Sequence, residues 1–270
     1  MRLYLAMAAW QSWAVLKRHM VVYLRNWHTA ALPPIFEPVI LLLVFGIGLG
    51  SNIPAFDWRT QNVSYLAYLA PGILAYTVFM TAFFQALFAA YIRMHYQKTW
   101  DGQLTTQVRL EHVVWGEALW SATLGLAYAV IVMLVLAGFS LAGWLEFHWY
   151  GLIAMLPLLF LAGVAFAALG LLFTAIVPTI DHMNIPFYLV IMPLGFASST
   201  YFPLESDTLL AQAWLSINPL HHLAEGIRLL LLSGVWSLHL AAALLLFGLM
   251  ILILLPVDLR LLRRRVLGEQ

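Results

Sequence analysis

Residues 93–117 read RMHYQKTWDGQLTTQVRLEHVVWGE and form the longest polar run between two long apolar runs of this 270-residue chain. Neither residues 62–92 before it nor residues 118–145 after it contain Asp, Glu, Lys or Arg. A bilayer core of about 30 Å is crossed by roughly 20 helical residues, so each flank is long enough to span it. The run is therefore predicted to be a loop between two membrane spans. Its basic residues Arg93, Lys98 and Arg109 place it on the cytoplasmic side.

The composition is that of an integral membrane protein. Hydrophobic residues make up 63% of the chain and charged residues 9%, whereas soluble domains carry about 25% charged residues. The absence of Cys excludes a disulfide framework, a thiolate nucleophile and a Cys-based metal site. No cleavable signal peptide is expected, because Lys17 and Arg18 interrupt the first apolar stretch.

Four short motifs in and beside the polar loop carry a resemblance to a known family. They are AYIRM at 90–94, QKTW at 97–100, LTTQV at 104–108 and GE at 116–117. With them the chain resembles the permease subunit of ABC type-2 transporters. Within that family it is most similar to the nodulation-factor (lipo-chitooligosaccharide) export permeases and to related polysaccharide and drug exporters. The resemblance extends over nearly the whole chain, while its motifs are confined to this one loop and its borders.

The resemblance implies that the loop holds a coupling helix, which docks into a separate ATPase subunit. The expected coupling residues are Gln97, Lys98, Thr99, Trp100, Asp101, Gln103, Leu104 and Thr105. Trp100 and Leu104 are four apart and are expected to form an apolar knob. Lys98 and Asp101 would make polar contacts at its rim. The alternative interpretation is an ordinary solvated loop.

The expected fold class is an all-α membrane protein, a single domain over residues 1–270, because spans with an apolar surface are helices in chains of this kind. Six transmembrane helices are predicted. They lie near residues 33–50, within 62–92, near 114–139, up to about 177, at 185–199 and at 235–256. Gly163, Ala167 and Gly170 give the fourth span a small-residue face suited to close helix packing. The inner turn after it is expected to offer a second ATPase contact at Pro178 and Asp181.

Residues 201–234 are predicted to form a re-entrant or interfacial helical hairpin on the outer side, before the last span. This stretch holds Glu205, Asp207, Glu225 and Arg228, so a complete span would be costly. With six spans and both termini in the cytoplasm, the inner segments hold all of the 13 Lys and Arg residues except Arg59 and Arg228. The positive-inside rule supports that orientation.

Both ends of the chain are predicted to meet the membrane surface. Residues 1–28 are expected to form one interfacial helix, with a polar stripe of Gln11, Arg18 and Arg25 seven apart and Ser12, His19 and Asn26 beside them. It is either an anchor or, as the resemblance implies, a gate helix bordering a lateral substrate entrance. The basic tail at 258–270 is expected to hold anionic lipid, with an ATPase contact as the alternative.

Few residues are candidates for a substrate path. Glu37 lies in the first turn of the first span, after Pro33 and Pro34. It is either structural, facing the positive end of the helix dipole, or part of the path. The other candidates for a path or gate are Trp10, Trp13, Tyr201 and Phe202. The remaining Trp and Tyr near the span ends are expected to form interfacial belts, with stacking on sugar rings as the alternative.

Enzymatic chemistry is not expected in this chain. It has no G-x-x-x-x-G-K-[ST] phosphate loop, so ATP and Mg²⁺ would be bound by the partner ATPase. No catalytic, cofactor-binding or metal-binding residue is predicted. His221, His222 and Glu225 are interpreted as a polar cluster at headgroup level, with a metal site as the alternative. Nucleic-acid binding has no support, because the basic residues are dispersed along the membrane borders.

The function expected is the permease of an ATP-driven exporter in a bacterial inner membrane. Its substrate would be amphiphilic: a lipid-linked glycan, a lipooligosaccharide or a drug. The expected partners are an ABC ATPase subunit, a second copy of this chain and membrane lipids. The alternatives are a secondary transporter driven by an ion gradient and a non-transporting membrane assembly factor.

Overall fold

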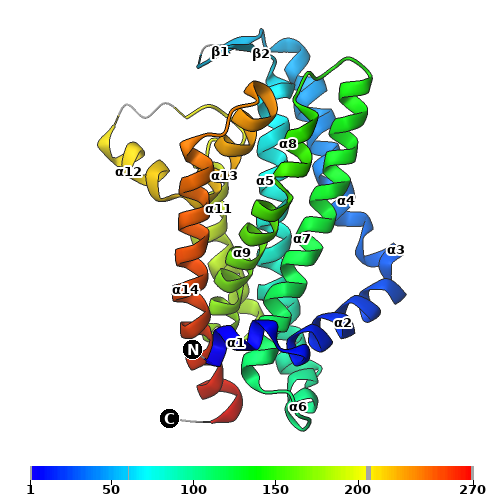
Figure 1. The fold of residues 1–270 in the computed structure, drawn as a ribbon, viewed down its shortest axis with the longest axis vertical. Coiled ribbons are helices and arrows are strands. Elements are labelled where there is room, and N and C mark those ends of the chain that lie inside the picture. Colours follow the sequence, from blue (N-terminus) through cyan, green and yellow to red (C-terminus); the bar gives the residue numbers. More distant parts are fainter. Residues whose placement is uncertain (1, 60, 205–207, 269–270) are drawn as a thin grey trace.

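The computed structural model describes residues 2–59, 61–204 and 208–268. Glu205 and Asp207 lie outside the described residues. Within the described residues, five helices are long and apolar enough to cross a membrane: Ile35–Asn52, Tyr65–Tyr96, Leu110–Leu141, Trp149–Ile176 and Leu238–Leu267. Figure 1 shows most of them running side by side along the long axis. The predicted membrane protein of mostly helical structure is therefore confirmed.

Each of these helices is built from one or more consecutive segments. The first combines α4 (Leu32–Leu41), η1 (Leu42–Leu49) and η2 (Gly50–Asn52). The second combines α5 (Tyr65–Phe84), η3 (Gln85–Ala89) and η4 (Ile92–Tyr96). The third is α7 (Leu110–Leu141), the fourth joins α8 (Trp149–Ala154) to α9 (Leu156–Ile176), and the fifth is α14 (Leu238–Leu267). The coupling-loop region between the second and third holds the short helix α6 (Thr99–Leu104).

The predicted span at residues 185–199 is helical but short. It is assembled from η5 (Ile180–Met183), α10 (Asn184–Pro186), η6 (Phe187–Ile191) and α11 (Met192–Phe196). At 1.5 Å per residue, residues 184–196 rise about 20 Å, less than a hydrocarbon core. The structure supports five membrane-length helices, and the count of six stays a prediction.

The region predicted as an outer hairpin contains two helices and a final helical turn. These are α12 (Leu209–Ile217), α13 (Pro219–Arg228) and η7 (Leu229–Ser233). Asn218 separates the first two, and its side-chain oxygen caps α13 by accepting from the backbone N–H of Leu220 at 3.0 Å. The helical pieces are confirmed, whereas their depth in a membrane stays a prediction.

A small β-hairpin lies at the same end of the molecule, where only a loop was expected. Strands β1 (Phe56–Trp58) and β2 (Gln61–Val63) pair antiparallel, with Phe56 opposite Val63. Figure 1 places this hairpin at the end opposite α6, while the N- and C-terminal ends lie near α6.

The N-terminal segment is three helices rather than one: α1 (Arg2–Ala8), α2 (Trp10–Arg25) and α3 (Trp27–Ala30). The prediction of a polar stripe toward the headgroups is wrong for Ser12 and His19, which are both buried. The reason is close packing on α7: a Cβ at Gly116 would lie 2.4 Å from Cγ1 of Val15. A glycine there lets α2 approach until these side chains face protein.

The packed core lies among α5, α7 and α9. A Cβ at Gly163 would come within 2.8 Å of the Ala122 Cα atom, and one at Gly170 within 2.6 Å of the Phe83 carbonyl oxygen. The predicted small-residue face is therefore confirmed, since these glycines let the backbones approach closely.

The basic residues after position 258 belong to the last turns of α14 rather than to a tail. Arg263 pairs with Glu111 of α7. Arg265 donates to the carbonyl oxygens of Thr174 at 2.8 Å and Val177 at 2.6 Å, where α9 ends. Arg263 and Arg265 therefore have protein partners on α7 and α9, and lipid binding by this basic segment stays a prediction.

Candidate functional site

A buried carboxylate joins the polar loop to the membrane helices. Glu117 of α7 is fully buried. Its Oε1 atom accepts from Nε of Arg93 at 3.0 Å and from Nε1 of Trp100 at 2.9 Å. A second guanidinium nitrogen of Arg93 pairs with Oε2, and Nε2 of His19 lies 3.2 Å from Oε1. Glu117 therefore contacts side chains from α2, η4 and α6 while belonging to α7 itself; these four residues are called the Glu117 cluster below.

The predicted coupling helix, α6, is oriented by this contact. Lys98, which precedes it, has a φ of +52°, a left-handed turn that redirects the chain out of η4. Trp100 is fully buried, and Leu104 packs partly buried against the core. Trp100 therefore does not form the exposed apolar knob that the sequence suggested. Its indole N–H instead donates to the Glu117 carboxylate, beside the donors from Arg93.

The exposed face of α6 and its flanks is polar. Gln97, Lys98, Asp101 and Thr105 are exposed, whereas Thr99 and Gln103 are half-buried. The Lys98 ammonium and the Asp101 carboxylate lie 3.9 Å apart. The structure thus divides the predicted coupling residues into an inward set centred on Trp100 and an outward polar set.

The N-terminal helices are fastened to α7 at two further points. Nε1 of Trp115 donates to the carbonyl oxygen of Leu3 at 2.6 Å. The hydroxyl groups of Tyr23 and Tyr128 are hydrogen-bonded to each other. Trp10 and Trp13 face away and are 63% and 50% exposed. These two indoles are therefore available to lipid or substrate, as either interpretation of the N-terminal helix requires.

The inner turn after α9 is exposed and also anchored. The Tyr91 hydroxyl donates to the Pro178 carbonyl oxygen at 2.8 Å, and Arg265 donates to the same oxygen at 3.2 Å. Pro178 and Asp181 are both exposed. The turn is thus tied through its backbone to the segment between η3 and η4 and to α14, which leaves the Asp181 carboxylate on the surface.

A groove follows one side of α5 past Glu37. Its first part is lined by Glu37, Tyr76, Thr77 and Thr81, among others. Its continuation shares Glu37 and Thr81 and adds Tyr23, Gln85 and Ile92. The last part shares Tyr23, Gln85 and Ile92 and reaches Arg18 and Gln97. Polar groups are therefore spaced along an otherwise apolar groove from Glu37 to the α6 end.

The other candidate gate residues lie beside that groove. The Tyr201 ring meets Tyr76 edge to face, with centroids 5.5 Å apart. Phe202 stacks on Tyr65 with centroids 6.3 Å apart. Tyr201 therefore contacts Tyr76, which lines the groove together with Glu37, whereas Phe202 packs against the start of α5.

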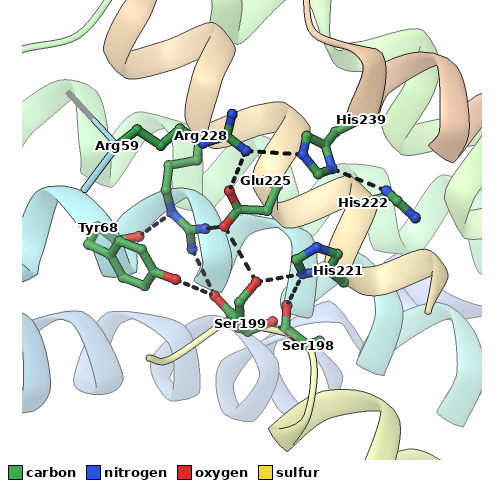
Figure 2. A network of polar contacts seen from close by, with 10 residues as sticks. Arg59, Tyr68, Ser198, Ser199, His221, His222, Glu225, Arg228 and His239 are labelled. Carbon is green, nitrogen blue, oxygen red and sulfur yellow. Dashed lines mark hydrogen bonds and ion pairs between the residues drawn. The ribbon is translucent and has the colours of Figure 1, made fainter. Parts of the chain in front are cut away.

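Figure 2 shows a second polar network, centred on Glu225 and Arg228. Arg228 of α13 is fully buried and pairs with Glu225 one helical turn before it. Its Nε donates to the Tyr68 carbonyl oxygen at 3.0 Å and its Nη2 to the Ser199 carbonyl oxygen at 3.1 Å. The guanidinium also lies over the Tyr68 ring, 3.7 Å from the centroid. Arg228 thus fastens the segment after α11 to both α5 and α13.

Three histidines extend this network. Nδ1 of His221 lies 2.7 Å from the Ser199 hydroxyl, and Nδ1 of His222 lies 3.1 Å from Nδ1 of His239. Arg59 reaches both Nε2 of His239 at 3.1 Å and Glu225 at 3.6 Å. Burial lowers the pKa of His221 to about 4, so this imidazole is neutral at neutral pH. The described residues contain no set of His, Asp or Glu arranged to hold a metal ion.

Comparison with known proteins decides the family. Residues 11–232 match the family model described as ABC-2 type transporter. The chain belongs to the ABC-2 type transporter family. Over 217 residues it is 34% identical to Nodulation protein J of Rhizobium leguminosarum bv. trifolii, covering 79% of this chain and 81% of the relative. Over 258 residues it is 30% identical to Nodulation protein J of Neorhizobium galegae, covering 94% and 93%. It is also 27% identical over 220 residues to a putative transport permease, ycf38, of Porphyra purpurea, covering 80% and 73%.

The family match confirms the resemblance drawn from the loop motifs. The matched region of this ABC-2 permease contains the Glu117 cluster and the second polar network except for His239. Sequence reasoning quoted Glu117 as a motif residue but gave it no role, and it left Arg228 and Glu225 unpaired. Their spacing of three residues on one helix was the available signal for the second pair.

Proposed function

We propose that this ABC-2 permease is the transmembrane subunit of an ATP-driven exporter and that a separate ATPase subunit docks on α6. The sequence supports the second polypeptide, because it contains no phosphate-binding loop for ATP and Mg²⁺. In the proposed orientation α6 and both termini are cytoplasmic, in a bacterial inner membrane. Two copies of the chain face each other across the substrate path.

The observation that carries the proposal is the Glu117 cluster. Trp100 of α6, Arg93 of η4 and His19 of α2 all meet one buried carboxylate of α7. Pulling Trp100 away would leave a buried acceptor short of one donor, at about 1–3 kcal/mol, and breaking the Arg93–Glu117 ion pair would cost about 3–5 kcal/mol. A displacement of α6 by the ATPase is therefore passed on to the second and third spans rather than absorbed in a loose loop.

The outward polar set is the proposed docking face. Gln97, Lys98, Asp101 and Thr105 offer donors and acceptors on the surface of the loop. Pro178 and Asp181 are proposed as a second contact, since both are exposed on the inner turn. Trp100, Leu104, Thr99 and Gln103 are proposed to position this face from within.

The proposed substrate is amphiphilic: a lipid-linked glycan, a lipooligosaccharide or a drug. The groove beside α5 supports this, because it combines Glu37, Tyr76 and Gln85 with long apolar walls. Exposed Trp10 and Trp13 on α2 are proposed to border its lateral entrance. Tyr201, next to Tyr76, is proposed as part of the gate together with Phe202.

The docking face is tested by charge reversal. Lys98→Glu and Asp101→Lys change exposed side chains, so folding should be preserved while docking is weakened. The measurement is the amount of ATPase that co-purifies from native membranes, together with vanadate-sensitive export. Asp57→Lys is the matched control, because Asp57 is exposed on β1, which lies at the end of the molecule opposite α6. Unchanged co-purification and export in both loop variants would remove the assignment.

A secondary transporter is the second candidate, and Asp258 of α14 favours it. This carboxyl group is fully buried, and neither of its oxygens has a hydrogen-bond partner within the described part of the chain. Ionisable groups inside membrane helices often carry protons in ion-coupled transporters. If transport depends on proton release at this site, Asp258→Asn would abolish it, whereas an ATP-driven permease would keep its activity.

A further inference from the structure

A polar pocket opens at the end of the molecule opposite α6, apart from the groove beside α5. It lies between β2 with the start of α5 on one side and the loop after α7 on the other. Its side chains with polar groups are Gln61, Asn62, Ser64, Trp144 and Glu146. All five residues are exposed. Figure 1 shows β2 and the adjacent ends of α5 and α7 at this end.

The end of α7 fixes the aromatic wall of this pocket. Gly143 has a φ of +78°, and the Trp144 N–H donates back to the Phe139 carbonyl oxygen at 2.9 Å. This is the pattern of a Schellman cap, in which a left-handed glycine turns the chain over the helix end. The Trp144 ring then rests against Phe139, with centroids 5.4 Å apart, and stays 55% exposed. One side of the indole is thus supported and much of the ring is left for a ligand.

The hydrogen-bonding groups on the opposite wall are also partly oriented. The Gln61 side-chain oxygen accepts from the Ser233 hydroxyl at 3.4 Å, which leaves its amide NH₂ group to donate into the pocket. The Ser64 hydroxyl oxygen accepts from the Ala67 N–H at 3.3 Å, so its own hydrogen is available to donate. Asn62 offers one donor group and one acceptor, and Glu146 offers acceptors only.

This mixture of groups selects the ligand chemistry. Glu146 is the one charged residue among the described residues that line the pocket, so an anionic ligand would be repelled. A simple cation would use the oxygens of Glu146 and of the two amides, and it would leave the amide NH₂ donors without partners. A sugar ring presents hydroxyl groups that both donate and accept, together with an apolar face that stacks on an aromatic ring. We propose that this pocket binds a neutral sugar ring, with its apolar face on Trp144 and its hydroxyls on Glu146 and Gln61.

The sugar can belong to a free oligosaccharide or to a glycolipid headgroup, because both present the same ring chemistry. The link to export rests on the proposed function: in that orientation the pocket is outside, where a glycan arrives after transport. The binding claim stands by itself, since it concerns residues remote from α6 and from Glu37.

The test is ¹⁹F NMR on the full chain in lipid nanodiscs with 5-fluorotryptophan at its 11 Trp positions. Trp144→Phe assigns the Trp144 resonance. The probes are a neutral glucose trisaccharide, a neutral N-acetylglucosamine trisaccharide and, separately, nanodiscs doped with a neutral glycolipid. We expect the Trp144 resonance to shift saturably with at least one probe. Glu146→Gln should weaken that binding about tenfold, since the hydrogen bond to this side chain is then no longer made to a charged group.

The controls separate a site from general surface effects. The Trp236 resonance, assigned by Trp236→Phe, should not move, because this indole is 65% exposed but does not line the pocket. A shift with a soluble trisaccharide supports free-glycan binding, and a shift with glycolipid alone supports headgroup binding. An observed Trp144 resonance that stays still with every probe overturns the proposal. Export that depends on the ATPase would be unaffected by that result, so the two proposals fail separately.

Discussion

The indole N–H of Trp100 donates to Oε1 of Glu117 over 2.9 Å, which ties the coupling helix to the membrane helix that follows it. Both side chains are fully buried, although they come from the most polar stretch of the chain. The contact fixes the position of α6 relative to α7. The same carboxylate binds Arg93 of η4, which precedes the loop. The helices before and after the loop are therefore joined at the Glu117 carboxylate.

Glu117→Gln should destabilise the fold strongly. The substitution keeps the shape but removes the charge that compensates the Arg93 guanidinium. Breaking a buried ion pair in this way costs about 3–5 kcal/mol. The measurement is thermal unfolding of the purified chain in detergent, monitored by the loss of monodisperse protein as the temperature rises. Glu146→Gln is the matched control, because Glu146 is exposed. Equal unfolding temperatures for the two variants would contradict a structural role for the cluster.

Trp100→Phe should weaken coupling without exposing the coupling helix to solvent. Phenylalanine retains an aromatic ring in the buried site but cannot donate to Glu117. Leaving a buried acceptor short of one donor costs about 1–3 kcal/mol. We expect export per ATP hydrolysed to fall while the ATPase still co-purifies. Trp10→Phe, at an exposed position, provides the comparison, and a Trp100→Phe variant with wild-type coupling would show that the hydrogen bond is dispensable.

Gly116→Ala should loosen the contact between α2 and α7. Its Cβ would lie 2.4 Å from Val15 Cγ1 and 3.2 Å from the Ser12 carbonyl oxygen, so the helices must separate. Overpacking of this kind costs about 1–3 kcal/mol. Thermal unfolding gives the readout, with Gly248→Ala as control because a Cβ there meets nothing within 4 Å. If both alanine variants unfold at the same temperature, the two helices are not in the close contact described.

Arg228→Gln should destabilise the folded protein more than the substitution of an exposed arginine would. The guanidinium binds the Tyr68 and Ser199 carbonyl oxygens and pairs with Glu225. We expect a cost of about 3–5 kcal/mol, since Glu225 is left buried with a weaker partner. A double-mutant cycle with Glu225→Gln, read by thermal unfolding, should show a large coupling energy. Additive effects of the two substitutions would mean that the pair does not act as a unit.

The sequence was sufficient to predict features that follow from long apolar runs and from the spacing of small residues within them. The loop at 93–117 lies between two long apolar helices, and Gly163 and Gly170 lie at close helix contacts, as predicted. The orientation of Trp100 was beyond reach, because α6 has six residues and such a short helix gives no reliable periodicity. The hydrogen-bond partner of Trp100, Glu117, lies 17 positions later in the chain, so the sequence did not reveal it. Without that partner, Trp100 was interpreted as a residue of the ATPase interface.

Buried polar residues account for the other differences. The spacing of Ser12 and His19 predicted a polar stripe at the membrane surface. Nothing in their local sequence reveals that Gly116 allows α2 to pack closely on α7 and bury them. Arg263 and Arg265 were predicted to bind lipid as part of a basic tail. The structure shows that they also contact acceptors on α7 and at the end of α9. In each case the partner is distant in sequence, so local pattern alone favoured solvent or lipid as the environment.

Transport by reconstituted vesicles tests the central claim most directly. Vesicles are prepared with this chain alone and with the chain plus its co-purified ATPase, and movement of the substrate against its gradient is measured with ATP or with an imposed proton gradient. We expect uphill movement only when the ATPase and ATP are both present, and we expect Glu117→Gln to abolish it. Uphill movement driven by the proton gradient in vesicles that contain this chain alone would contradict a permease moved through α6.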